Sequence, residues 1–149
     1  MNTVYDAFIS YARADAGRVQ PWVEQLKAAN LTLWQDTSSI QGGADWERAI
    51  SDGIGNSHVL IAFVSPQSLN STWCQREWFL AKHEQKTIIP VLLDSTRQQL
   101  PSDLAAYNAI NLHATDALPR LLASVLTART TTPKQSAQGA QQVNYIDSI

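Results

Sequence analysis

The sequence predicts an α/β protein in which five parallel strands form one sheet and helices cover both of its faces. Through the first 128 residues, short and almost wholly apolar runs alternate with longer amphipathic segments. This alternation is typical of strand–helix–strand units joined by right-handed crossovers. The apolar runs lack a polar–apolar alternation, which indicates strands buried on both faces. A charged fraction of 16%, below the usual value of about 25%, agrees with such a covered sheet.

The strands are predicted from apolar runs that are rich in β-branched residues and bounded by polar loops. The clearest run extends from Val59 to Val64, where every residue is apolar. The predicted strands cover residues 4–10, 31–35, 59–64, 87–93 and 109–112.

The helices are predicted where apolar residues recur three and four positions apart. In the first helix, Val19, Val23 and Leu26 fall on one face. In an open α/β sheet, ligands bind outside the carboxyl ends of the strands. We therefore expect the functional residues in the loops that follow the strands. The predicted helices cover residues 15–29, 45–54, 72–85 and 117–127.

The composition changes near Arg129, and from there polar and small residues dominate. Such a stretch buries too little apolar surface to offset the entropy cost of ordering it. We therefore predict a folded domain over residues 1–128 and a flexible linker or tail over residues 129–149, of the kind that leads into a further domain of a longer protein. The alternative is an extra strand or helix formed by the last few residues.

The composition also argues against several classes of protein. A net charge of −2 gives no basic excess, so a nucleic-acid partner is not expected. One cysteine excludes an intrachain disulfide and every multi-cysteine metal site. No apolar run approaches the roughly 18 residues of a membrane helix, and the N-terminus lacks a signal-peptide pattern. We expect a soluble, cytoplasmic protein without membrane contact.

Motifs for bound phosphate and metal are missing. The sequence contains neither a GxxxxGK[ST] motif nor a GxGxxG motif after the first predicted strand, so no dinucleotide cofactor is predicted on that ground. His58, His83 and His113 are scattered without ligand spacing, and no metal site is predicted. A phosphoacceptor receiver domain would need acidic residues where this chain has Ser10-Tyr11 and Ser65-Pro66.

The loop after the third predicted strand leads into a helix with an unusual start. Thr72 can cap this helix, and Gln75 three residues later would complete a capping box. Trp73 and Glu77 then lie four residues apart on the same helix face, near the carboxyl edge of the sheet. The ordinary alternative is that Glu77 only interacts favourably with the helix dipole.

Three stretches together resemble Toll/interleukin receptor (TIR) domains. They are the Tyr-Asp-Ala-Phe-Ile-Ser-Tyr run at residues 5–11, Asp36 with the following loop to Gly42-Gly43, and Val64-Ser65-Pro66 with Trp73-Cys74-x-x-Glu77. Their order and spacing cover about residues 4–128, in a style that resembles bacterial members. The resemblance implies a flavodoxin-like three-layer sandwich. It also implies cleavage of NAD+ between nicotinamide and ribose, with NAD+ as substrate and no further cofactor.

The resemblance assigns the catalytic role to Glu77, which follows Trp73 in a W-x-x-x-E arrangement. It also marks several substrate-binding candidates, most of which have an ordinary alternative. Arg13 could meet a phosphate or lie solvated at the surface. Each tryptophan among them could stack on a nucleotide ring or pack in the core. The candidates are Trp73, Ser10, Tyr11, Arg13, Trp34, Asp36, Gly43 and Trp46.

The predicted activity is that of an NAD+ glycohydrolase or ADP-ribosyl cyclase, which gives nicotinamide with ADP-ribose or a cyclic isomer. The resemblance implies homo-oligomers through the loop around Gly43, activation by self-assembly, and a role in bacterial antiphage immunity or in NAD+ depletion of a host. The alternative is a non-catalytic adaptor that signals only through TIR–TIR contacts.

Overall fold

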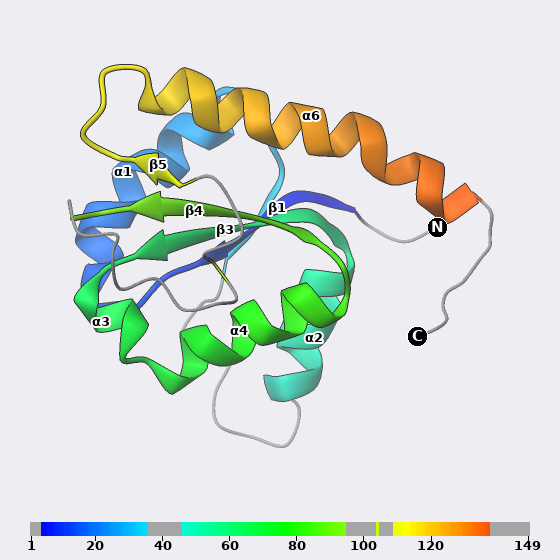
Figure 1. Ribbon diagram of the computed structural model, residues 1–149, viewed down its shortest axis with the longest axis horizontal. Coiled ribbons are helices and arrows are strands. Elements are labelled where there is room, and N and C mark those ends of the chain that lie inside the picture. Colours follow the sequence, from blue (N-terminus) through cyan, green and yellow to red (C-terminus); the bar gives the residue numbers. More distant parts are fainter. Residues whose placement is uncertain (1–3, 36–45, 95–103, 105–108, 138–149) are drawn as a thin grey trace.

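The protein folds around one five-stranded sheet, seen in the computed structural model (Figure 1). The structure describes residues 4–35, 46–94, 104 and 109–137, and for residues 46, 47 and 129–137 it describes the backbone only. Within this part of the chain, no helix is both long enough and apolar enough to cross a membrane.

The sheet is wholly parallel, as the sequence predicts, with the strand order β2-β1-β3-β4-β5. This order is that of the flavodoxin-like α/β sandwich. The central strand β3 is two residues longer at its start than the predicted strand. The strands are β1 (Tyr5–Ser10), β2 (Leu33–Gln35), β3 (Ser57–Val64), β4 (Thr87–Leu92) and β5 (Ile110–Asn111).

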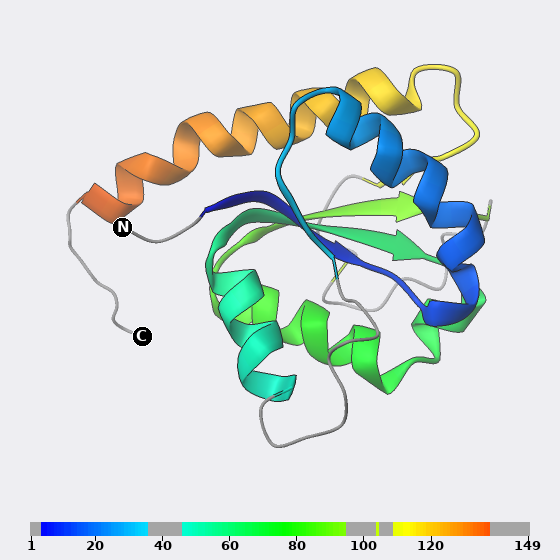
Figure 2. The same cartoon turned by 180° about the vertical axis from the view of Figure 1, so that it is seen from behind.

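Helices cover the sheet on both faces (Figures 1 and 2), and their side chains form two separate cores with it. The α1–α6 face packs residues such as Val19 and Leu121 against Ile61 of β3. The α2–α4 face packs Trp78 against Leu60 of the same strand. The helices on these faces are α1 (Ala16–Ala28), α2 (Trp46–Gly55), α3 (Pro66–Leu69), α4 (Thr72–His83) and α6 (Ala117–Ala137), and a 3-10 turn, η1 (Arg13–Asp15), precedes α1.

The start of α4 corrects one prediction. The N-cap is Ser71, whose side chain accepts a hydrogen bond from the backbone N–H of Cys74, and Thr72 is the first helical residue. The side chain of Gln75 instead donates to the carbonyl oxygen of Leu69, so no capping box forms there. Serine and threonine are similar as caps, and the turn that precedes α4 decides which of the two neighbours is used.

A capping box does occur one helix earlier, in a turn that the sequence analysis did not predict. Ser65 caps α3, accepting a bond from the backbone N–H of Ser68, while the Ser68 hydroxyl bonds the backbone of Ser65. A helix of four residues is too short to produce a helical periodicity. It extends the path between β3 and α4 and thereby sets where α4 begins.

The last helix extends farther than predicted. We expected it to end at residue 127, but α6 extends to Ala137. Adding a residue to an existing helix costs much less than nucleating one, and Ala128, which ends the packed half, and Arg129 after it are strong helix formers. Residues 138–149 lie outside the described part of the chain, so the division into a domain and a tail stays a prediction.

Candidate active site at the carboxyl edge of the sheet

The carboxyl ends of β1 and β3 lie side by side at the point where the strand order reverses. From β1 the chain passes to β2 on one side, and β3 pairs with β1 on the other. Such a switch point is where ligands bind in open α/β sheets. Ser10 ends β1 here, and Ser65 follows the end of β3.

Glu77 is held at this switch point by Ser10. The Ser10 hydroxyl donates a hydrogen bond of 2.7 Å to Oε1 of Glu77. The indole Nε1–H of Trp78 donates a bond of 3.0 Å to the same Ser10 oxygen. Glu77 is only 2% exposed and Ser10 is fully buried. The structure therefore places a carboxylate from α4 against the end of β1, in the desolvated α2–α4 core.

Trp73 and Cys74 lie on the turn of α4 before Glu77. Trp73 is half-buried against the α2–α4 core, and its position four residues before Glu77 puts both side chains on one helix face. Burial raises the pKa of the Cys74 thiol to about 12, and the nearby charge of Glu77 contributes to the same shift. Cys74 is therefore a protonated thiol at neutral pH, which argues against a role as nucleophile.

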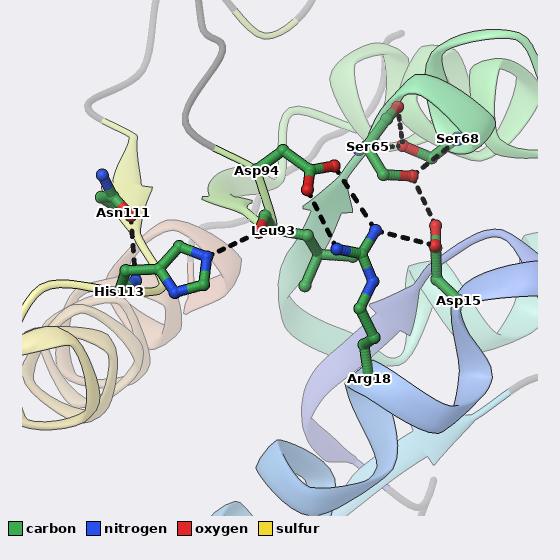
Figure 3. A network of polar contacts seen from close by, with 8 residues as sticks. All are labelled: Asp15, Arg18, Ser65, Ser68, Leu93, Asp94, Asn111 and His113. Atoms are coloured by element: carbon green, nitrogen blue, oxygen red, sulfur yellow. Dashed lines mark hydrogen bonds and ion pairs between the residues drawn. The ribbon is translucent and has the colours of Figure 1, made fainter.

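A second polar network lies at the same edge of the sheet (Figure 3). Asp15 is buried and accepts a hydrogen bond from the Ser65 hydroxyl, and Arg18 donates to its other oxygen at 3.1 Å. Arg18 also donates to Asp94 at 3.0 Å. The network thus joins the start of α1 to the carboxyl ends of β3 and β4.

The Arg18 and Asp94 side chains of this network are exposed, and each shifts the pKa of the other. The hydrogen bond from Arg18 is the main cause that holds the pKa of Asp94 below its usual range, and the bonds to Asp94 and Asp15 raise the pKa of Arg18. His113 lies nearby, with Nε2 3.0 Å from the carbonyl oxygen of Leu93. This contact fixes the turn after β5 to the end of β4 (Figure 3).

Three of the predicted substrate-binding residues differ from Ser10 in their surroundings. Tyr11 follows Ser10 but packs against the opposite, α1–α6 core, because successive side chains of a strand point to opposite faces. Arg13 is exposed in η1. Trp34 stacks on Phe8, with ring centroids 4.5 Å apart, and its indole lies so close to Gly53 that any Cβ there would clash. Trp34 is a packing residue in this structure.

The remaining candidates lie wholly or partly outside the described residues. Asp36 and Gly43 lie outside the described residues, and for Trp46 the structure gives only its place as the first residue of α2. Their predicted roles stay predictions. Among the described residues, no three His, Cys, Asp or Glu side chains are grouped to hold a metal ion.

An open depression of about 370 Å³ lies at the opposite, amino edge of the sheet, between the start of β4 and α6. Its lining side chains carry no ionisable group, so it offers no chemistry comparable to that around Glu77. The lining residues are Thr87, Ala123, Ser124, Thr127 and Ala128.

The fold and the sequence both place the chain among TIR domains. The sequence matches the family model described as TIR domain over residues 7–122, and the chain belongs to this family. The crystal structure of the TIR domain of the Toll-related receptor TRR-2 from Hydra magnipapillata superposes with a TM-score of 0.71, over 83% of this chain and 99% of that one. At 21% sequence identity, this likeness bears on the fold alone.

Two named relatives carry enzyme names. The sequence is 29% identical over 100 residues to the probable 2′ cyclic ADP-D-ribose synthase TcpO of Methanobrevibacter olleyae, which covers 64% of this chain and 29% of that protein. It is 34% identical over 77 residues to the NAD(+) hydrolase TcpC of Escherichia coli, which covers 51% of this chain and 25% of that protein. The chain spans less than a third of the length of either relative.

Sequence reasoning missed two features of this edge. Trp78 was not among the predicted site residues, yet its indole N–H bonds the Ser10 hydroxyl oxygen. The Asp15–Arg18 pair carries a weak signal in its spacing of three residues on a helix start, but its contacts with Ser65 and Asp94 join residues far apart in the sequence. No local sequence pattern predicts these contacts.

Proposed function

We propose that this TIR domain cleaves NAD+ between nicotinamide and ribose, with Glu77 as the catalytic carboxylate. One observation carries the proposal: the carboxylate of Glu77 is held at the β1–β3 switch point by a 2.7 Å hydrogen bond from Ser10. The names of the two relatives support the same reaction class. ADP-ribose and a cyclic ADP-ribose isomer are the alternative products.

The reaction needs only one carboxylate. The bond between C1′ of the ribose and the pyridinium nitrogen breaks, and its electron pair leaves with nicotinamide as a neutral molecule. The leaving group therefore needs no general acid, unlike the alkoxide in glycoside hydrolysis. The oxocarbenium-like ribose that remains is stabilised electrostatically by the carboxylate of Glu77. Water then adds to C1′ and releases a proton to give ADP-ribose, or a nucleophile of the substrate itself adds and closes a ring.

The burial of Glu77 adds a condition to this proposal. Because only 2% of Glu77 is exposed, the groups that cover the carboxylate must move aside before the ribose can reach it. We assign this opening to self-association, with the loop around Gly43 as the contact between copies. The setting that fits is cytoplasmic and bacterial, in antiphage immunity or in depletion of host NAD+, and no nucleic acid, membrane or further cofactor takes part.

The test is incubation of the purified protein with NAD+, free and clustered on a multivalent support, followed by chromatography of the products. Clustered wild type should release nicotinamide, and Glu77→Ala should lower the rate by about 100-fold or more. A matched control is Glu24→Ala, which removes an exposed carboxylate on α1 that bonds Gln20. This control should behave as wild type.

Two outcomes would contradict the proposal. Equal nicotinamide release by wild type and Glu77→Ala would remove Glu77 from the catalytic role. No release by clustered wild type would favour the adaptor function, in which the chain acts through TIR–TIR contacts alone.

A further inference from the structure

We infer that Ser10 and Trp78 form a two-residue relay that positions the Glu77 carboxylate, and that Ser10 acts on the reaction through Glu77 rather than by contact with substrate. This inference rests on the proposed cleavage of NAD+ at Glu77. It replaces the predicted substrate contact of Ser10 and gives Trp78 a function beyond packing.

The relay has a defined direction. A serine hydroxyl has one proton to donate and lone pairs that accept. Trp78 can only donate through its indole N–H, so its 3.0 Å bond to the Ser10 oxygen occupies a lone pair. The Ser10 proton is then directed to Oε1 of Glu77 at 2.7 Å. The three side chains therefore form a chain of hydrogen bonds that runs one way, from indole to hydroxyl to carboxylate.

Burial and packing hold both residues of the relay in place. Ser10 is fully buried and Trp78 is 1% exposed. The Trp78 ring is part of the α2–α4 core, and Ser10 is fixed by its pairing with Ala62 of β3. A hydrogen bond inside such a low-dielectric site is stronger than one in water. Ser10, which is fixed in the sheet, thereby holds the Glu77 side chain of α4 in one position.

The relay predicts a loss in kcat. A hydrogen bond to a charged group, or a small displacement of a catalytic group, accounts for about 10- to 100-fold in rate. Ser10→Ala should therefore lower kcat for NAD+ cleavage by about 10- to 100-fold and leave KM within about twofold. Trp78→Phe removes the N–H and keeps most of the ring, and it should lower kcat by a smaller factor.

The matched control is Ser57→Ala. Ser57 is also a buried serine on a strand, and its hydroxyl bonds the carbonyl oxygen of Gly53 at 2.6 Å, at the amino end of β3 and away from Glu77. Its loss should lower the melting temperature by an amount similar to that of Ser10→Ala while kcat stays at the wild-type value. A kcat loss in both variants would mean that destabilisation alone explains the effect, and would overturn the relay.

Double-mutant cycles separate positioning from other roles. If Trp78 acts through Ser10, then Ser10→Ala with Trp78→Phe should lose no more activity than Ser10→Ala alone. If Ser10 acts through Glu77, then adding Ser10→Ala to Glu77→Gln should leave the residual rate unchanged. Additive losses in either cycle would overturn the inference. So would a raised KM with an unchanged kcat in Ser10→Ala, because that pattern indicates direct substrate binding.

A measurement without substrate keeps the inference separate from the proposed function. The indole N–H resonance of Trp78, assigned by its disappearance in Trp78→Phe, should shift in Ser10→Ala and, through the hydroxyl, in Glu77→Gln. Ser57→Ala should leave it in place. If clustered wild type cleaves no NAD+ while these shifts occur, the proposed function fails and the relay remains as a hydrogen-bond chain. If Glu77→Gln leaves the resonance unmoved, the relay itself fails.

Discussion

Two buried carboxylates lie at the same edge of the sheet, and they have different surroundings. Glu77 is 2% exposed and Asp15 is 3% exposed, and each accepts a hydrogen bond from a serine hydroxyl. Asp15 also accepts from Arg18, a full positive charge. The serine that bonds Glu77 accepts in turn from a neutral indole, that of Trp78.

The difference distinguishes a carboxylate that links three elements through a cation from the carboxylate that we propose as catalytic. Asp15 ties the start of α1 to the end of β3, and through Arg18 to Asp94 after β4. Asp15 shares the Arg18 guanidinium with Asp94, and both of its carboxylate oxygens are engaged in the network. The bond from Ser10 ties Glu77 of α4 to the end of β1 at the switch point of the sheet. This contrast leads to four predictions, given from the largest expected effect to the smallest.

The activity test should separate the two carboxylates most strongly. Glu77→Gln keeps the shape of the side chain and removes its charge, and it should lower the rate of NAD+ cleavage by about 100- to 1000-fold. Asp15→Asn makes the corresponding change in the Arg18 network and should lower the rate by less than about 10-fold. The measurement is nicotinamide release by clustered protein. Equal losses would show that the two carboxylates do not differ in function.

The reactivity of Cys74 probes the Glu77 region. With its pKa raised to about 12 by burial, the thiol carries little thiolate at pH 8, where an ordinary thiol of pKa about 8.5 is partly ionised. Native protein should therefore react with a thiol reagent about 100-fold or more slowly than urea-unfolded protein. The rate in Glu77→Gln should be similarly slow, since burial is the larger cause. Fast labelling of the native protein would contradict the burial of this helix turn.

For the free energy of unfolding, we expect the substitution of Asp15 to have a larger effect than that of Glu77. Asp15→Asn weakens a charge-assisted bond and a buried hydroxyl contact, and it should lower the free energy of unfolding by about 1–3 kcal/mol in urea titrations. Glu77→Gln retains an oxygen that accepts from Ser10 and should cost about 1 kcal/mol or less. A larger loss in Glu77→Gln than in Asp15→Asn would contradict the linking role of Asp15.

The parts of this fold that depend on neighbouring residues in the sequence were predictable. The strands followed from continuous apolar runs such as Val59 to Val64, because strands buried on both faces leave such runs. The pairing of Trp73 and Glu77 on one helix face followed from helical spacing alone. That pair, on a helix that follows the third strand, predicted a site at the carboxyl edge of the sheet.

The partners of these residues were not predictable, since they are set by packing. Ser10 meets Glu77 across 67 positions of sequence, and Arg18 meets Asp94 across 76. Tyr11 was grouped with Ser10 as a substrate-binding residue, yet strand alternation places it against the other core. Which face of β1 carries the site depends on where α4 packs, and that is a property of the whole fold.

The smallest expected effect concerns the exposed end of the Arg18 network. The Asp94 side chain is 39% exposed and that of Arg18 is 44% exposed, so solvent and salt screen their interaction. Asp94→Asn should lower the free energy of unfolding by only about 0.2–1 kcal/mol near neutral pH in dilute buffer. In about 1 M salt, where the screening length is about 3 Å, the loss should fall toward zero.

The Arg18–Asp94 pair should also make the stability of the protein depend on pH in a defined direction. The pKa of Asp94 is lowered in the folded state, chiefly by the hydrogen bond from Arg18, so the folded protein favours the ionised carboxylate. The stabilisation is therefore fully present above the ordinary pKa of about 3.9 and is lost as the pH falls through the lower value of the folded state. Arg18, whose pKa is raised, stays charged throughout.

The stability difference between wild type and Asp94→Asn should thus be constant from about pH 5 to 8 and shrink below about pH 4. Asp52→Asn, a change at an exposed carboxylate on α2, is the control. A difference for Asp94→Asn that persists in acid or in high salt would show that the pair stabilises the fold by packing rather than by charge.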